Sequence, residues 1–362
     1  MDPALEENPV AGTILRQLSP VPAYHIVDRD ALIHELNSYG DDPRYEGKQI
    51  LLIDRYAGQL VKDCPGTKGH ICCGYKVINV VTNCPMDCSY CILQVYLNNP
   101  FVTVYPEFDK IFGEIEEIMN EKSHHFFRFG TGELGDSLVL DQITGFSREA
   151  VPFFAGKHNG ILELKTKAAD VDHLLSLDHR GKTVVSWSLN PAKLVQEEEF
   201  HTASLHERMQ AARRCQNAGY FLGFHFDPLV CYPGWQEDYR ELVDLLFQHV
   251  DPRGILWISL GGLRFPPSLK KTAHERFPKT KVFSGELVPG DDGKFRYLKP
   301  IRVEMYRKML SWLREYDPNL FVYLCMERGD VWQAVYGTSP KHTAGLNRRF
   351  EQRIIDAWRS RT

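Results

Sequence analysis

The sequence contains no apolar run that approaches the roughly 18 residues of a membrane-spanning helix, so no membrane span is expected. It also lacks the basic and apolar start of a secretory signal, because its first residues, M-D-P-A-L-E-E-N-P, are acidic and interrupted by proline. Low-complexity tracts are missing too. These absences predict a cytoplasmic protein without a membrane partner.

A basic excess, the usual mark of a nucleic-acid binder, is absent as well. The chain has 43 Lys and Arg against 47 Asp and Glu, a formal net charge of −4. One local cluster of basic residues runs from Lys270-Lys271 to Lys281, and it predicts either a basic patch or the solvated face of a helix. The overall charge argues mildly against nucleic acid as a partner.

The chain is long enough to bury a large core: 362 residues, of which 43% are hydrophobic and 25% charged. It has nine cysteines, an odd number, and several of them are clustered. An odd and clustered set is typical of metal binding in a reducing compartment rather than of a disulfide framework.

The most informative stretch is N-C-P-M-D-C-S-Y-C at residues 83–91, where Cys84, Cys88 and Cys91 follow the spacing Cys-x3-Cys-x2-Cys. A structural zinc site uses four ligands in a closed tetrahedron, and an ordinary ferredoxin cluster uses four cysteines. Three cysteines leave one iron of a [4Fe–4S] cluster without a protein ligand, so that a small molecule can bind there.

This spacing, with Tyr90 directly before the last cysteine, resembles the radical S-adenosylmethionine (SAM) superfamily. The resemblance implies that SAM chelates the open iron and is cleaved reductively to methionine and a 5′-deoxyadenosyl radical, which abstracts hydrogen from a substrate. The alternative is a reduced or zinc-bound cysteine cluster whose fourth ligand is Cys64, Cys72, Cys73 or His70.

Apolar and β-branched segments alternate with helical patterns through the middle of the chain. Strict alternation implies a parallel sheet with right-handed crossovers. Six units are too few for an eight-stranded barrel, so the prediction is an open six-stranded partial (β/α)6 TIM barrel of the radical SAM type. The six predicted strands are 75–82, 126–129, 160–166, 183–189, 220–226 and 254–260. Among the helices between them, one is expected from Asp141 to about Phe153, a short one at 171–177, and one from a capping box at 204–207 to Gly219.

The alternation predicts three regions: an N-terminal extension at 1–74, the barrel at 75–262, and a C-terminal region at 263–362 that packs on the barrel. In the last region helices are expected at 269–277 and 303–316, and 321–324 could add one more strand.

Polar residues follow strand after strand at the carboxyl ends, where parallel α/β barrels place their sites. Glu133, behind glycines in G-T-G-E, is predicted to accept from the amino group of SAM. Lys167 could neutralise the SAM carboxylate or a substrate anion, and Ser188 and Asn190 could hold the ribose hydroxyls. His225 and Asp227 form either a buried hydrogen-bonded pair or a substrate-facing pair.

From Tyr75 to about Gly337 the sequence resembles the spore photoproduct lyase family of radical SAM enzymes. The resemblance implies one [4Fe–4S] cluster on Cys84, Cys88 and Cys91, and cleavage of a methylene-bridged thymine dimer in DNA with hydrogen returned by a cysteine. The stretches that carry it are C-S-Y-C-I-L-Q (88–94), L-E-L-K-T-K-A-A-D-V-D-H-L-L (162–175), G-K-T-V-V-S-W-S-L-N (181–190), A-G-Y-F-L-G-F (218–224), G-W-Q-E-D-Y (234–239) and Y-L-C-M-E (323–327).

The chain departs from this family at two points. Glu133 stands at about the position of the donor cysteine, and Ile92 replaces the tyrosine that follows the third cluster cysteine, whereas Tyr90 is retained. A carboxylate has no weak X–H bond to give. Either another residue donates hydrogen, with Cys231 just beyond the fifth strand as the candidate beside Tyr90, or the reaction is different.

The leading hypothesis is therefore a radical SAM enzyme, reduced by a flavodoxin or ferredoxin, with a DNA photolesion as the substrate that the family implies. A second hypothesis keeps the chemistry but applies it to a small metabolite, peptide or modified nucleoside. A third, of another class, is a non-catalytic zinc-binding module.

Overall fold

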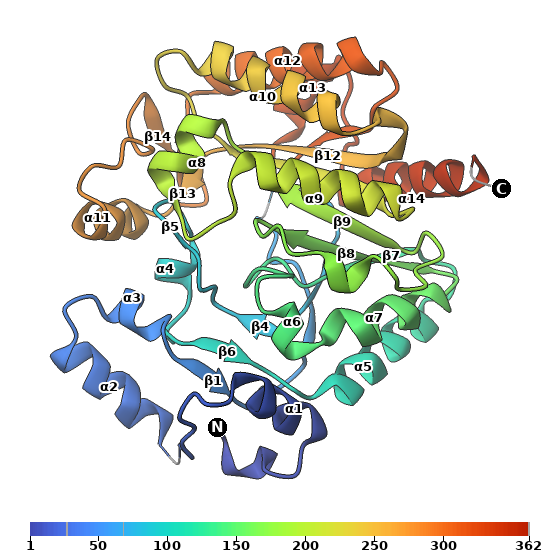
Figure 1. Cartoon of the computed structure of the whole chain (residues 1–362). Coiled ribbons are helices and arrows are strands. Elements are labelled where there is room, and N and C mark those ends of the chain that lie inside the picture. The colour runs from blue at the N-terminus through green and yellow to red at the C-terminus, as the bar shows by residue number, and fades with distance from the viewer. Residues whose placement is uncertain (27, 68, 361–362) are drawn as a thin grey trace.

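The computed structural model describes residues 1–26, 28–67 and 69–360. Its centre is a curled open sheet of eight strands in the order β16-β12-β11-β9-β8-β7-β3-β2 (Figure 1). Neighbouring strands from β3 to β16 pair in parallel, and β2 pairs antiparallel with β3. The strands are β2 (Val61–Asp63), β3 (Lys76–Ile78), β7 (Phe127–Gly130), β8 (Gly160–Thr166), β9 (Thr183–Ser188), β11 (Phe221–Leu229), β12 (Ile255–Gly262) and β16 (Val322–Leu324).

The predicted partial barrel is confirmed: β3, β7, β8, β9, β11 and β12 lie side by side in the predicted order. The sheet is one strand wider at each edge than predicted. β16, which the sequence left open, extends it beyond β12, and β2 extends it beyond β3.

Helices cover the outside of the sheet, as Figure 1 shows for α5, α7, α9 and α10. Each buries one apolar face; in α5 that face is Phe108, Ile111, Ile115 and Met119. The helices between barrel strands are α5 (Phe108–Glu121), α6 (Asp141–Thr144), α7 (Phe146–Ala155), α8 (Ala192–Glu198), α9 (Leu205–Asn217) and α10 (Trp235–His249). The predicted capping box is present at the start of α9, where Ser204 and Glu207 satisfy each other's backbone N–H groups.

Three predicted elements differ in the structure. The strand predicted at 75–82 is two strands, because the chain leaves the barrel sheet after Ile78. It then forms β4 (Val81–Thr82) in a second sheet with β6 (Val102–Val104) and β1 (Leu51–Ile53). The helix predicted from Asp141 is split by Gly145, whose φ of +71° ends the helical geometry. The short helix at 171–177 is only a 3₁₀ turn, η2 (Asp172–Leu174).

The N-terminal region, in which the sequence showed no strong period, contains η1 (Pro3–Leu5), α1 (Pro9–Leu18), α2 (Arg29–Tyr39) and α3 (Pro43–Gly47). Asn8, Asp28 and Asp42 cap the three α-helices with side-chain oxygens. These helices lie together with the small sheet at the bottom of Figure 1.

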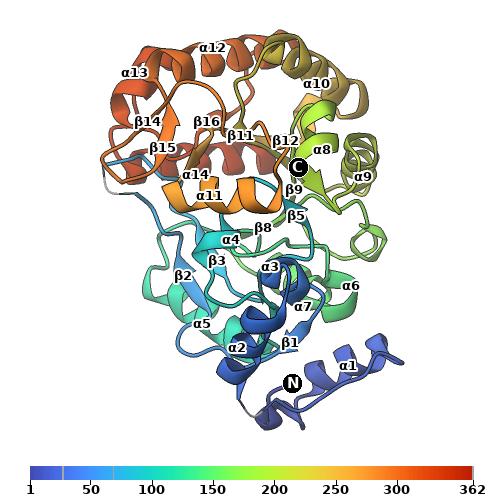
Figure 2. The same cartoon turned by 90° about the vertical axis from the view of Figure 1, so that its left-hand side faces the viewer.

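The C-terminal region crosses the ends of the barrel strands. Figure 2 shows α11 between the segment of β5 and α4 on one side and the hairpin of β14 and β15 on the other. The elements are η3 (Pro252–Gly254), β13 (Arg264–Phe265), α11 (Pro267–Arg276), β14 (Leu287–Pro289), β15 (Phe295–Tyr297), α12 (Lys299–Tyr316), α13 (Gly329–Tyr336) and α14 (Thr343–Arg359).

The two edges of the open sheet are linked by an isolated bridge between Ile71 and Glu327. The backbone N–H of Ile71 donates to the carbonyl of Glu327 at 2.9 Å. The buried Glu327 carboxylate accepts from Arg302 Nε and Tyr306 Oη, each at 2.8 Å. We call this contact the seam. Across the described ranges, the helices are too short or too polar to traverse a lipid bilayer.

Candidate active site

The three cysteines of the motif lie on a tight loop that begins where β4 ends. Asn83 adopts a left-handed conformation, with φ of +66°. Its side chain accepts from the N–H of Cys84 at 2.9 Å and donates to the carbonyl of Pro100 at 2.7 Å. Asn tolerates this conformation because its short polar side chain can bond locally. The loop then forms β5 (Asp87–Cys88), which pairs antiparallel with β10 (Glu199–Phe200), and continues into α4 (Leu93–Tyr96).

The donor set of this loop is three thiols. Burial and the neighbouring charge of Asp136, with Cys91 and Cys88 nearby, raise the pKa of Cys84. Three thiolates leave a closed zinc site one ligand short, because structural zinc takes four. They suit a four-iron cluster in which one iron has no protein ligand.

Asp87 fixes the cysteine loop to distant parts of the chain. Its buried carboxylate accepts from Lys48 Nζ at 2.8 Å and from Arg276 Nη2 at 2.9 Å. Burial alone would raise the pKa of Asp87, but these two cations lower it below its usual value. Arg276 also donates to Gln94 Oε1 and, through Nε, to Asp42 Oδ2 at 2.8 Å. The loop is therefore held between α3 and α11.

Glu199 lies at the centre of a second buried network and was not predicted. Its Oε1 accepts from Tyr90 Oη, from Lys167 Nζ at 3.0 Å and from Asn190 Nδ2 at 2.8 Å. Its Oε2 accepts from Arg208 Nη2 at 2.6 Å. Burial opposes ionisation, but Lys167 and Arg208 outweigh it and hold the pKa of Glu199 at about 2. The structure thus brings together Tyr90, Lys167 and Asn190, which the sequence selected one by one.

The remaining predicted cofactor residues, Ser188 and Glu133, end or follow barrel strands. Ser188 ends β9 half-buried, and its carbonyl accepts from Arg208 Nη1 at 3.0 Å. Glu133 follows β7, and its carboxylate is 3.6 Å from Lys165 Nζ, with 36% of the side chain exposed. Asp136 accepts from Thr166 Oγ1 at 2.6 Å and from the N–H of Lys167 at 2.8 Å, which positions the backbone of Lys167.

A further set of buried polar side chains meets at Glu163, on strand β8 of the barrel. Glu163 Oε1 accepts from Ser186 at 2.7 Å, from Trp257 at 2.9 Å and from His225 Nε2 at 2.8 Å. Burial works against ionisation here too, but the hydrogen bonds and nearby positive charge lower the pKa of Glu163 to about 2. Of the two alternatives for His225 and Asp227, the hydrogen-bonded pair is wrong, because His225 bonds to Glu163 and Asp227 accepts from Arg264 Nη2 at 3.0 Å. The alternative that they face the substrate stays a prediction.

Two thiols lie at different sides of the barrel mouth. Cys231 lines a cavity of about 440 Å³, and its backbone N–H donates to Tyr297 Oη at 3.0 Å. Cys325 follows β16, with Arg264 Nη2 3.5 Å from its sulfur. Burial raises the pKa of both thiols, so both carry their S–H hydrogen at neutral pH.

The curled parallel sheet, with a three-cysteine loop next to its first barrel strand, defines a radical SAM enzyme. A family model described as "Spore photoproduct lyase" matches residues 72–299. The chain belongs to the spore photoproduct lyase family.

Curated relatives agree with this, and solved structures share the fold. The chain is 33% identical over 251 residues to the spore photoproduct lyase of Geobacillus sp. (strain Y412MC61), which covers 67% of this chain and 74% of that relative. It is 32% identical over 223 residues to the enzyme of Bacillus subtilis (strain 168), covering 61% of this chain and 64% of the relative. A spore photoproduct lyase complexed with dinucleoside spore photoproduct superimposes with a TM-score of 0.78 at 24% identity, covering 89% of this chain and 97% of that one. A mutant lyase with bound AdoMet and the same dinucleoside gives a TM-score of 0.75 with the same coverage.

Proposed function

We propose that Cys84, Cys88 and Cys91 hold a [4Fe–4S] cluster with one open iron for SAM, and that the enzyme acts on a thymine photolesion in DNA. When bound, the cluster and SAM supply one-electron cleavage to a 5′-deoxyadenosyl radical, which takes a hydrogen atom from the substrate. The observation that carries the proposal is the cysteine loop, whose three thiols lie on one short segment that pairs through β5 with the strand of Glu199.

The proposal assigns the neighbouring side chains to SAM. Glu133 is a partly exposed carboxylate that can accept from an ammonium group. Lys167 and Asn190 are held in place by Glu199, and Ser188 ends the adjacent strand, so they form one polar wall next to Tyr90. Their preorganisation is the property that would let a charged ligand bind without a large ordering cost.

The reaction is tested by anaerobic reconstitution with iron and sulfide, followed by reductant and SAM. We expect 5′-deoxyadenosine from the natural protein and none from Cys88→Ala, which should also fail to assemble the cluster. Cys72→Ala is the matched control, because Cys72 lies outside the motif, and it should behave as the natural protein. SAM cleavage by Cys88→Ala would refute the scheme, and a colourless zinc protein would support a metal-binding module instead.

For the substrate, the names of the relatives and of the superimposed complex support a DNA lesion. The reductant is proposed to be a flavodoxin or ferredoxin, in the cytoplasm. Binding to ultraviolet-irradiated duplex DNA should weaken steeply as salt rises, because phosphate contacts release counterions. No binding at low salt would move the proposal to a small metabolite, peptide or modified nucleoside.

For hydrogen return we propose Cys231, because its half-buried thiol lines a cavity that a substrate can reach. The substrate radical would take the S–H hydrogen atom, and the thiyl radical would regain one electron from the reductant and a proton from solvent. Cys231→Ala should lower product yield and solvent-deuterium incorporation without stopping SAM cleavage. Cys325→Ala is the comparison: if it alone has this effect, the donor lies at β16.

A further inference from the structure

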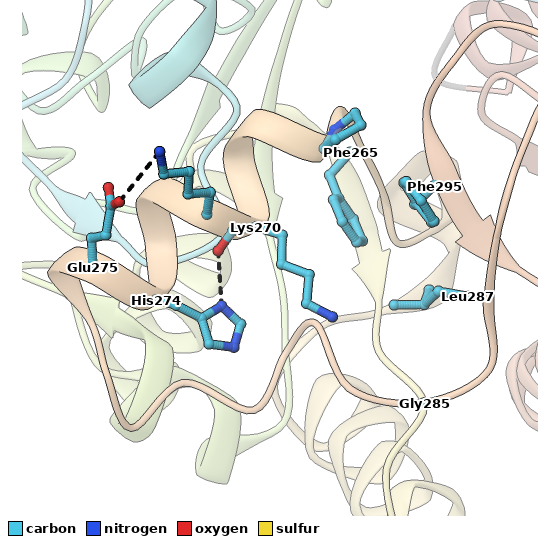
Figure 3. Close-up of a pocket in the computed structure, with 9 residues that line it drawn as sticks. Phe265, Lys270, His274, Glu275, Gly285, Leu287 and Phe295 are labelled. Atoms are coloured by element: carbon cyan, nitrogen blue, oxygen red, sulfur yellow. Dashed lines mark hydrogen bonds and ion pairs between the residues drawn. The ribbon is translucent and has the colours of Figure 1, made fainter.

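A second recess lies outside the site described above, between α11 and the β14–β15 hairpin. Its volume is about 700 Å³, within the usual range for small-molecule sites. One wall is apolar and is made by Phe265, Leu287 and Phe295, and the other is the basic face of α11 with Lys270, Lys271 and His274 (Figure 3). We call this recess the α11 groove.

The apolar wall contains a stacked aromatic pair. The rings of Phe265 and Phe295 lie 5.9 Å apart between centroids, with their planes inclined by only 17°. Phe265 is buried, with an edge contact to Phe283 whose ring centroid is 4.8 Å away, and it supports the half-buried ring of Phe295. A planar ligand such as a nucleobase can continue such a stack on Phe295.

The basic wall carries one cation that is not neutralised within the described part of the chain. Lys271 Nζ lies 3.9 Å from the carboxylate of Glu275, which balances its charge. No ion pair or hydrogen bond of the Lys270 ammonium exists among the described residues, and Figure 3 shows that side chain extending into the groove towards Gly285. His274 Nδ1 donates to the carbonyl of Lys270 at 2.8 Å, which leaves the ring's other nitrogen for a ligand.

The groove is next to the candidate active site. Gly285 lines both the groove and the cavity that contains Cys231. The same helix that carries Lys270 is anchored to the cysteine loop by Arg276, through Asp87 and Gln94. A strand whose reacting base enters the barrel mouth would therefore pass along this wall.

We propose that the α11 groove binds a nucleotide that flanks the reacting base, with its base against Phe295 and its phosphate at Lys270. The inference rests on the proposed function, since it requires a DNA substrate. It also explains why a chain of net charge −4 concentrates basic residues at 270–281. The flanking phosphate supplies the complementary charge, and the aromatic wall distinguishes a nucleotide from other anions.

Lys270→Ala and Lys110→Ala form a matched pair, because each removes one exposed lysine charge and Lys110 lies on α5, outside the groove. The measurement is fluorescence anisotropy of a labelled single-stranded oligonucleotide over a series of salt concentrations. Lys270→Ala should weaken binding and reduce the slope of log affinity against log salt by about 0.7–1, the value for one lost phosphate contact. Lys110→Ala should match the natural protein. Equal losses in both variants, or no loss in either, would overturn the proposal.

A second measurement tests stacking. With 2-aminopurine beside the lesion, the natural protein should change the probe's fluorescence, and Phe295→Leu should remove that change while keeping the apolar volume. Competition by polyglutamate as strong as by DNA would show an unselective anion site and overturn the proposal. If the natural protein repairs irradiated DNA but Lys270→Ala binds as tightly, only the groove assignment is wrong. If the natural protein does not bind DNA, the proposed substrate is wrong as well.

Discussion

Glu199 is the shared partner of several side chains of the candidate active site. Its carboxylate is fully buried between Arg208 and Lys167 and also accepts from Tyr90 and Asn190. Such a carboxylate stabilises the protein only because its partners are complete, since removing one member leaves the others buried without a counter-charge.

Glu199→Gln should therefore lower the free energy of unfolding by about 3–5 kcal/mol, the usual cost of breaking a buried ion pair. Urea unfolding measures the change. Glu197→Gln is the control, because Glu197 is exposed on the preceding helix, and its effect should stay within about 0.5 kcal/mol. Equal stability of the two variants would show that the network is not a stabilising one.

Glu163 predicts how stability depends on pH. Its folded pKa of about 2 lies below the ordinary value of 4.5, so its contribution is complete above pH 4.5 and is lost as the pH falls through 2. This difference between the folded and the ordinary pKa corresponds to about 3 kcal/mol in the free energy of unfolding. Glu163→Gln should show a flatter loss of stability between pH 4.5 and 2, measured by thermal unfolding. Unchanged acid sensitivity would mean that Glu163 does not titrate in this range.

Sequence reasoning at this scale found residues that stand next to a recognisable motif. Tyr90 was selected because it lies within the cysteine motif, and Lys167 and Asn190 were selected because they come directly after predicted strands. Glu199 was missed because the run Q-E-E-E-F at 196–200 has the appearance of a solvated helix end. Lys165 was missed as well, although it lies two residues after Glu163 and must share its face of the strand.

Among the elements, α11 has two functions that follow from its two faces. One face forms the wall of the α11 groove, and its last residue, Arg276, joins Asp42, Asp87 and Gln94. The position of this helix therefore couples the groove to the cysteine loop.

Arg276→Ala should loosen the cysteine loop. Lys48 still partners Asp87, so a loss of about 3 kcal/mol is expected, at the low end for a buried pair. Hydrogen exchange of residues 84–94 should speed up, and less cluster should assemble on reconstitution. Arg253→Ala provides the comparison, since Arg253 is exposed and pairs with nearby Asp251. Unchanged exchange in the loop would show that α11 does not hold it.

The elements themselves were predictable where one period persisted. β8, β9, β11 and β12 match the predicted strands closely, because each is a largely apolar run, β-branched in β9 and rich in Phe in β11, bounded by turn residues. No local feature of the sequence marks the division of 75–82 into β3 and β4. Asn79 and Val80 leave the barrel sheet because their backbones bond to distant residues, Leu60 and Tyr105. The N-terminal helices did carry signals, Asn8-Pro9 and Asp42-Pro43, but too few apolar repeats to define a period.

Considered as a whole, the molecule depends on the seam to bring together the edges of an open sheet. The described residues between β2 and β3 (64–67 and 69–75) include Cys64, Cys72 and Cys73, whose role the sequence could not assign. The division at residues 74 and 262 stays a prediction, although the seam ties the first and last predicted regions to each other directly.

Glu327→Gln should weaken the seam, because Arg302 and Tyr306 lose the carboxylate that they share. We expect alkylation of Cys72 and Cys73 to become about tenfold faster, which corresponds to about 1.4 kcal/mol of easier local opening. Mass spectrometry of the labelled peptides measures the rate. Glu117→Gln, an exposed change on α5, should leave the rate unaltered. Equal labelling in both variants would show that the seam does not protect these thiols.

The long separation between the cysteine loop and its anchor has a consequence for how the protein matures in the cell. Arg276 follows Asp87 by 189 residues, and Thr280, which donates to Glu198, comes later still. At about 5–20 residues per second, a ribosome needs about 10–40 s to make that stretch. Throughout this interval the thiols are already synthesised but lack their enclosing helix. Delivery of iron and sulfide can therefore begin during translation, whereas the enclosed site can form only when translation is nearly complete.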